Sequence, residues 1–143
     1  VVTAWNPTQL SGTPLPPCHL MHMYTVDPAN KLLHSSFVMR SNDVPFGLPF
    51  NIMGYAFLNH AFSAILNLTP GTLTYFAQDA HIYKNQYAMV EEQLERTPRE
   101  LPTFKFKKQL NSFNDLLNLE YEDIEIEGYD PYPDIKDKPG MAV

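Results

Sequence analysis

Hydrophobic and polar positions along the chain predict short strands before and after one strongly apolar helix. Residues 20–26 are apolar enough for a buried strand, and residues 31–40 can pair with them as a hairpin through a turn at 27–30. Over residues 50–68 apolar side chains recur all round a helical wheel, which predicts a central, mostly buried helix. The run Asn67-Leu68-Thr69-Pro70-Gly71 is expected to stop it.

Weaker patterns predict the remaining elements. Alternating, β-branched or aromatic residues indicate strands at 1–5, 72–76, 104–108 and 122–127, the last with one solvated acidic face. Residues 83–95 suit an amphipathic helix, and the segment 128–141, rich in proline and glycine, is expected to be irregular. We find no internal repeat and expect no second domain.

Composition narrows the class of protein. The 143 residues are 44% hydrophobic and 13% aromatic, which is enough for one domain with its own core. No apolar run approaches the roughly 20 residues of a membrane span, and a single cysteine permits no internal disulfide, so we expect a soluble, cytoplasmic protein. The net charge of −6 disfavours nonspecific nucleic-acid binding, and the histidine spacing predicts no metal site.

Residues with useful chemistry gather in short motifs. The single cysteine lies in Leu15-Pro16-Pro17-Cys18-His19. Three further motifs follow it, namely Arg40-Ser41-Asn42-Asp43, Gly47-Leu48-Pro49-Phe50-Asn51 and Asp79-Ala80-His81-Ile82-Tyr83. Taken singly, each residue has a structural interpretation: Cys18 as a small buried hydrophobe, Asp43 as a turn residue, His81 as a core histidine and Asn51 as a helix N-cap.

Taken together and in this order, the motifs resemble thymidylate synthase over essentially the whole chain. Trp5-Asn6-Pro7, Glu125-Ile126-Glu127-Gly128-Tyr129 and the terminal Met141-Ala142-Val143 also match. The resemblance implies an α+β fold in which a twisted mixed or antiparallel sheet packs on the central helix. It further implies that residues 1–143 are the C-terminal half of one catalytic domain and that the protein is a homodimer that pairs through one sheet face. From the charge and the hydropathy we expect that it binds neither nucleic acid nor membrane.

The resemblance also implies reductive methylation of dUMP to dTMP with 5,10-methylenetetrahydrofolate. A cysteine thiolate adds to C6 of uracil in this family, which assigns that role to Cys18. The implied catalytic residues are Cys18, Arg40, Asp43 and Asn51. Those implied to bind dUMP are Arg40, Ser41, Asn51, His81, Tyr83 and His19, with Asn51 at O4 and N3–H of uracil. Those implied to bind the folate are Asp43, Phe46, Gly47, Phe50, Ala142 and Val143.

Two alternatives stand beside this interpretation. Residues 38–47 also resemble the pyrimidine-nucleotide hydroxymethylases, in which water captures the exocyclic methylene, and Met23 and Met39 stand where synthases usually carry glutamine. The other alternative is a noncatalytic or split-enzyme fragment that needs a separate N-terminal polypeptide. The N-terminal half of the family would carry a phosphate-loop arginine, a glutamate and tryptophans of the folate pocket, so we expect negligible turnover from these 143 residues alone.

Overall fold

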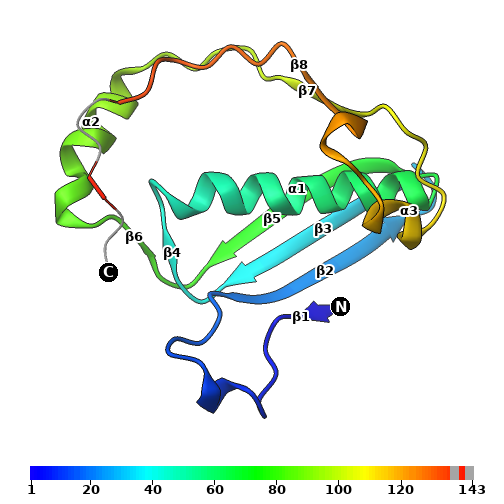
Figure 1. Ribbon diagram of the computed structural model, residues 1–143, viewed down its shortest axis with the longest axis horizontal. Helices are drawn as coiled ribbons and strands as arrows, with labels where there is room; N and C mark the ends of the chain where they lie inside the picture. Colours follow the sequence, from blue (N-terminus) through cyan, green and yellow to red (C-terminus); the bar gives the residue numbers. More distant parts are fainter. Residues whose placement is uncertain (136–138, 141–143) are drawn as a thin grey trace. The chain divides into compact units, whose positions relative to one another are not determined.

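The computed structural model describes residues 1–135 and 139–140 (Figure 1). Contacts divide the chain into two compact units, Val1–Ile82 and Tyr83–Val143, and each is described by itself. In the part of the chain that the structure describes, no helix combines the length and the apolar character that crossing a bilayer would require.

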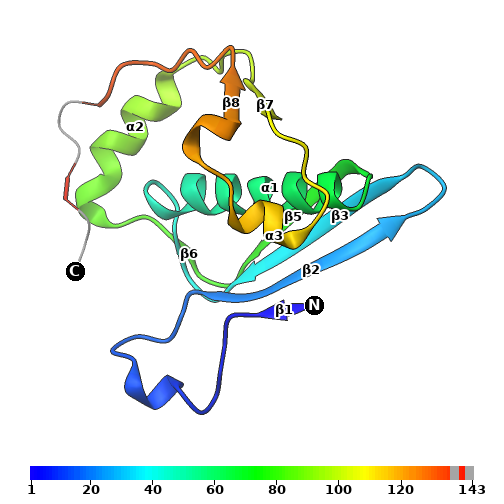
Figure 2. The ribbon, with the colours of Figure 1, turned by 45° about the vertical axis from the view of Figure 1, so that its right-hand side comes forward.

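The first unit is built on a mixed four-stranded sheet. Its strands, in spatial order, are β1 (Val2–Thr3), β2 (His19–Asp27), β3 (Leu32–Met39) and β5 (Thr69–Ala77). The first three run antiparallel, whereas β5 runs parallel to β3. Helix α1 (Gly47–Ile65) lies alongside the sheet in both ribbon views and packs on β3 and β5 (Figures 1 and 2). This arrangement confirms the predicted α+β fold with a mixed sheet on a central helix.

The predicted hairpin joins β2 to β3. Asp27 Oδ1 accepts hydrogen bonds from the N–H groups of Ala29, at 3.0 Å, and Asn30, at 3.2 Å, which closes the turn. Burial differs between the two strands. Alternate residues of β3 are buried, whereas His22 is the buried residue of β2, so the prediction of a buried strand at 20–26 is wrong in that respect. Within this unit α1 covers only part of the sheet.

Helix α1 begins at Gly47 and ends at Ile65, each earlier than the sequence pattern predicted. Asp43 Oδ1 accepts a hydrogen bond from the Phe46 N–H at 3.2 Å, which turns the chain into the helix. Beyond its end, Asn67 takes a left-handed conformation with φ 54°, which asparagine tolerates well. The chain therefore enters β5 at Thr69, before the predicted strand at 72–76.

The core of the first unit lies between α1 and β3. Phe37 is fully buried and stacks on Tyr55 of α1, with ring centroids 4.0 Å apart and an interplanar angle of 17°. On the N-terminal half of α1, in contrast, Phe50, Ile52 and Met53 are exposed. The helix is buried on its sheet-facing side rather than all round, because within this unit it packs against a single sheet face.

The first unit also contains η1 (Leu10–Gly12) and a short parallel pair, β4 (Asn42–Asp43) and β6 (Ala80–His81).

The second unit contains η2 (Lys84–Gln86), α2 (Tyr87–Glu95), β7 (Thr103–Phe106), α3 (Phe113–Leu117), η3 (Tyr121–Asp123) and β8 (Ile124–Glu127). Strands β7 and β8 pair antiparallel. The sequence pattern did not predict α3, whose N-cap Ser112 accepts a hydrogen bond from the Asp115 N–H. Residues 128–135 and 139–140 have no regular structure, as expected.

Candidate active site

The segment that carries Cys18 enters β2 and is held by Arg40 at the end of β3. Cys18 is a half-buried free thiol, and its carbonyl oxygen accepts a hydrogen bond from the Arg40 N–H at 2.9 Å. The Arg40 guanidinium donates from Nε to the carbonyl oxygens of Pro16 and Pro17, both at 3.2 Å, and from Nη2 to that of Pro16. Trp5 Nε1 also donates to the Pro17 carbonyl oxygen, at 3.0 Å. The candidate nucleophile therefore follows a segment anchored by an arginine and an indole.

Ser41 and His81 lie on either side of one carboxylate. Pairing of β4 with β6 sets Asp43 opposite His81, and the Asn42 N–H donates to the Asp79 carbonyl oxygen at 2.8 Å. Ser41 Oγ donates to Asp79 Oδ2 at 3.2 Å, and His81 Nδ1 lies 3.5 Å from the same oxygen. Sequence reasoning did not select Asp79 as a site residue, although its position in the His81 motif was the available signal.

Asn51 lies in the second turn of α1, where its Oδ1 accepts a hydrogen bond from Asn42 Nδ2 at 2.6 Å. The interpretation of Asn51 as the N-cap is wrong, because Phe46 occupies that position and makes no side-chain cap bond. A Cβ atom on Gly47 would lie 3.4 Å from Asn42 Nδ2 and 3.5 Å from Asn51 Oδ1, so glycine leaves this side of the pair open.

A cavity of about 300 Å³ lies between His19, at the start of β2, and helix α1. It is lined by His19, Phe50, Asn51, Gly54, Tyr55 and Leu58. His19 Nδ1 and the Tyr55 hydroxyl share a hydrogen bond of 2.8 Å. An aromatic wall with a carboxamide and an imidazole at its edge suits a planar, hydrogen-bonding ring. Tyr55 was not selected from the sequence, although its place one helical turn after Asn51 was the available signal.

The family model for thymidylate synthase matches residues 1–142.

The chain belongs to the thymidylate synthase family. This confirms the resemblance, which rested on short motifs from Trp5 to the C-terminus. The family consists of methyltransferases of nucleotide biosynthesis that use methylenetetrahydrofolate.

Of the residues that the thymidylate synthase resemblance assigns to the folate, four are described by the structure and two are not. Asp43, Phe46, Gly47 and Phe50 lie together at the start of α1, where Asp43 accepts from the Phe46 N–H. Ala142 and Val143 lie outside the described residues. Tyr83, which was assigned to the nucleotide with His81, is the first residue of the second unit, and its backbone N–H donates to Gln86 Oε1 at 2.8 Å.

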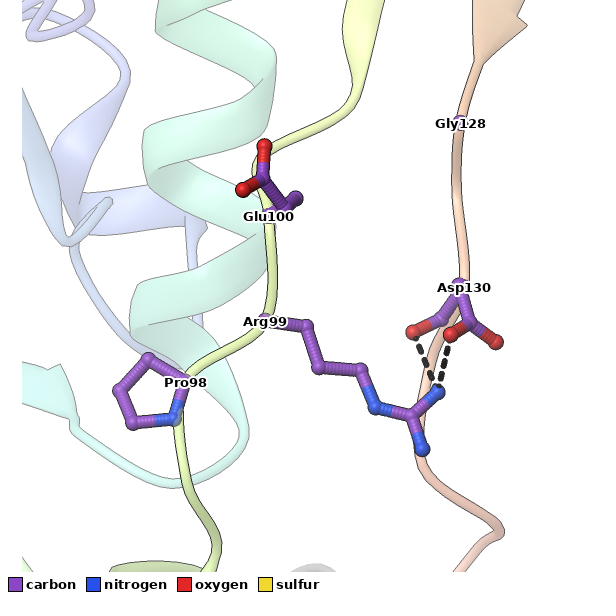
Figure 3. A pocket seen from close by; sticks show the side chains of 5 residues that line it. All are labelled: Pro98, Arg99, Glu100, Gly128 and Asp130. Carbon is purple, nitrogen blue, oxygen red and sulfur yellow. Dashed lines mark hydrogen bonds and ion pairs between the residues drawn. The ribbon is translucent and has the colours of Figure 1, made fainter.

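The second unit of this thymidylate synthase family chain has a larger hollow, of about 680 Å³, lined by Pro98, Arg99, Glu100, Gly128 and Asp130 (Figure 3). Arg99 points across it to Asp130 and binds Oδ2 at 2.6 Å. Its guanidinium carbon lies 4.0 Å from the ring centroid of Tyr132. A carboxylate and an aromatic face already engage this arginine, which is typical of a structural contact. The candidate nucleophile and the convergent polar groups lie instead in the first unit.

Within residues 1–135 and 139–140, no three side chains of histidine, cysteine, aspartate or glutamate gather closely enough to hold a metal ion.

Proposed function

We propose that this chain supplies the nucleotide-binding part of a thymidylate synthase that converts dUMP to dTMP. The cavity that joins His19, Asn51 and Tyr55 carries the proposal, because it places a carboxamide beside the residue that follows Cys18. Uracil is planar and offers an acceptor at O4 and a donor at N3, which one carboxamide can match. The single free thiol agrees with a reducing, cytoplasmic setting.

In the proposed reaction, Cys18 Sγ forms a bond to C6 of the uracil ring, and the displaced π electrons move toward O4 as an enolate at C5. Asn51 hydrogen-bonds O4 and N3–H and so supports that charge. C5 would then bond to the one-carbon unit and lose its proton, hydride transfer would reduce that unit to the methyl group, and Cys18 would leave C6 as the thiolate while the folate departs as dihydrofolate. The reduced folate, when bound, supplies the one-carbon unit and the hydride.

Phosphate recognition falls to Arg40 and Ser41. Three carbonyl contacts occupy Nε and Nη2 of Arg40, and within the described residues Nη1 makes no hydrogen bond. Nη1 is therefore the group that we assign to a phosphate oxygen, while the positive charge favours the thiolate of Cys18. His81 and Tyr83 are assigned to the 3′-hydroxyl of the sugar.

The start of α1 suits the folate in the same proposal. Phe50 is 69% exposed on the wall of the cavity and offers apolar surface to a flat ring. Asp43 would hydrogen-bond the pterin, Gly47 would permit close approach and Phe46 would add apolar area. We assign Ala142 and Val143 to a tail that closes over the ligand and excludes water.

Trapping the covalent adduct tests the proposed reaction. Residues 1–143, together with the N-terminal half of the family's domain, are incubated with 5-fluoro-dUMP and methylenetetrahydrofolate, since fluorine at C5 blocks loss of the proton, and the intact mass is measured. We expect a gain of nucleotide plus folate that maps to Cys18 and is lost in Cys18→Ser. Absence of an adduct would contradict the proposal.

With dUMP as substrate, a methylated product supports the synthase, whereas a hydroxymethylated product identifies the hydroxymethylase alternative.

We further propose that residues 1–143 need the N-terminal half of the family's domain, in the same or another polypeptide, to turn over dUMP. The phosphate-loop arginine, the glutamate and the folate-pocket tryptophans of that half have no counterpart in this sequence. Steady-state assays of residues 1–143 alone should give negligible dTMP. Turnover by residues 1–143 alone comparable with turnover in the presence of that half would refute this.

A homodimer that pairs through the sheet face opposite α1 completes the proposal. Met21, Val38 and Phe76 form one row across β2, β3 and β5, and Phe37 next to them faces α1, so the row points away from the helix. Phe76 is 55% exposed. In sedimentation velocity, Phe76→Asp should weaken the dimer. The control Leu94→Asp, at an exposed position on α2, should leave it unchanged. An unchanged oligomer in Phe76→Asp would rule this face out.

A further inference from the structure

Asn42 is a buried residue of the Arg40–Asp43 motif, and none of the roles proposed above belongs to it. It is 4% exposed in β4, and its Nδ2 donates to Asn51 Oδ1 at 2.6 Å. Within the described residues its own Oδ1 is buried without a hydrogen-bond partner. Burial of a side-chain amide with only one of its two polar atoms hydrogen-bonded lowers stability. The hydrogen bond to Asn51 offsets part of that cost for Asn42.

An asparagine that reads a pyrimidine needs its orientation fixed. Uracil presents an acceptor at O4 and a donor at N3, whereas cytosine presents a donor at N4 and an acceptor at N3. The two ends of a carboxamide are nearly identical in shape, and a half-turn about its terminal torsion exchanges donor and acceptor. A freely turning Asn51 could therefore pair with either base. The residue type alone does not select uracil.

We propose that Asn42 fixes the orientation of the Asn51 carboxamide and thereby acts as a positioning residue that selects uracil over cytosine nucleotides. This inference rests on the proposed function of Asn51. In the observed orientation Asn51 Oδ1 accepts from Asn42 and keeps a second lone pair for N3–H of uracil. Asn51 Nδ2 is then directed to O4. Turning the Asn51 amide over would set two NH₂ groups against each other and lose the 2.6 Å bond.

The backbone around Asn42 is suited to this positioning role. Its N–H donates to the Asp79 carbonyl oxygen at 2.8 Å, and it pairs with Ala80 in the β4–β6 ladder. Asn51 lies on α1, which contacts β4. Asn42 and Asn51 both extend from regular backbone. Their hydrogen bond therefore fixes the orientation of the Asn51 amide in the cavity relative to β4.

Nucleotide selectivity is the test. Dissociation constants for dUMP and dCMP are measured by calorimetry on the wild-type chain and on the variants Asn42→Ala and Asn42→Asp, each with the N-terminal half of the domain present. In Asn42→Ala the preference for dUMP should fall about tenfold, which is the range of one lost hydrogen bond. In Asn42→Asp the acceptor-only carboxylate should draw Asn51 Nδ2 toward itself, turn the Asn51 oxygen to position 4 of the base and lower the preference further.

Asn59→Ala is the matched control, because Asn59 is an equally buried asparagine on α1 whose Oδ1 has no hydrogen-bond partner among the described residues. It should change stability without changing selectivity. A wild-type preference for dUMP that persists in full in both Asn42 variants overturns the role of Asn42 while the proposed function stands. A wild-type protein that shows no preference for dUMP overturns both. The near-isosteric Asn42→Asp keeps the test valid if Asn42→Ala folds poorly.

Discussion

Arg40 Nη2 donates a hydrogen bond to the carbonyl oxygen of Pro16, 2.5 Å away, while its Nε donates to both Pro16 and Pro17. The planar guanidinium thus spans two consecutive carbonyls of the segment that leads to Cys18. An ammonium group is a point charge and cannot reproduce this fork. The arginine therefore has a structural task at the same place where a phosphate role is proposed for it.

Replacing Arg40 by lysine should loosen the Cys18 segment while keeping the charge. Trp5 reports on this, because it is the only tryptophan and its Nε1 donates to the Pro17 carbonyl oxygen. We expect Arg40→Lys to shift the tryptophan emission to longer wavelength and to cost about 1–2 kcal/mol of unfolding free energy. Arg96→Lys is the control, since Arg96 pairs with the half-exposed Glu92 and such pairs contribute little. Unchanged emission in Arg40→Lys would contradict the anchoring role.

The sequence pattern predicted the hairpin and the central helix because both depend on local signals. Asp27 and Asn30 close their turn by contacts within four residues. The start of α1 was misplaced because the apolar pattern begins only at Phe50, yet Pro49 fits the first turn of a helix. The true start depends on the Asp43 side chain. Helix α3 is too short for a hydrophobic period to reveal it.

In the candidate site, too, features that depend on local sequence signals could be predicted and contacts between distant elements could not. Cys18 and Asn51 were selected by their motifs, because residue type and family pattern suffice for that. Asn42, Tyr55 and Asp79 were not selected, because each is distinguished by a hydrogen bond to a partner far from it in the sequence. The Asn42–Asn51 bond joins β4 to α1, and the His19–Tyr55 bond joins β2 to α1. Such pairs follow from tertiary packing, which no short pattern contains.

Gly71 in β5 should not tolerate a side chain. A Cβ atom there would lie 2.8 Å from His34 Nδ1 and 3.1 Å from the Leu33 carbonyl oxygen. His34 cannot move freely, because its Nδ1 accepts from the Thr72 N–H at 3.0 Å. We expect Gly71→Ala to lower the unfolding free energy by about 1–3 kcal/mol, measured by urea titration.

Gly54→Ala is the matched control for that prediction. Gly54 lies within α1 and a Cβ atom there would meet nothing within 4 Å among the described residues. Alanine at this position should raise stability by roughly 0.5–1 kcal/mol through helix propensity. Equal effects at Gly71 and Gly54 would contradict the predicted steric conflict.

Asn51→Asp should move nucleotide preference from dUMP toward dCMP. The ionised carboxylate accepts hydrogen bonds but donates none, so it cannot satisfy O4 of uracil, whereas N4 of cytosine offers it a donor. We expect the dissociation constant for dUMP to rise at least about tenfold and that for dCMP to fall, by calorimetry. Asn67→Asp makes the same chemical change at an exposed loop position and should alter neither. Unchanged dUMP preference in Asn51→Asp would remove Asn51 from base recognition.

Stability should depend on the protonation of His22. Burial lowers the pKa of His22 from 6.5 to about 4, and its Nε2 is buried without a hydrogen-bond partner among the described residues. Its neighbours are the phenols of Tyr24, which bonds Nδ1 at 2.9 Å, and of Tyr55, whose ring centroid lies 4.6 Å away. Burial raises the pKa of both phenols, so at neutral pH they are uncharged and offer no counter-charge to an imidazolium.

The direction of the pH effect follows from these values. Between about pH 6.5 and 4 the unfolded chain binds a proton at His22 that the folded chain does not, so the unfolding free energy should fall as the pH falls through this window. We expect a loss of at most about 3 kcal/mol from this residue, measured by urea unfolding at several pH values. His22→Phe should remove that part of the slope and leave a smaller one from His60, whose pKa burial also lowers. A variant with the wild-type slope would show that His22 is not the titrating group.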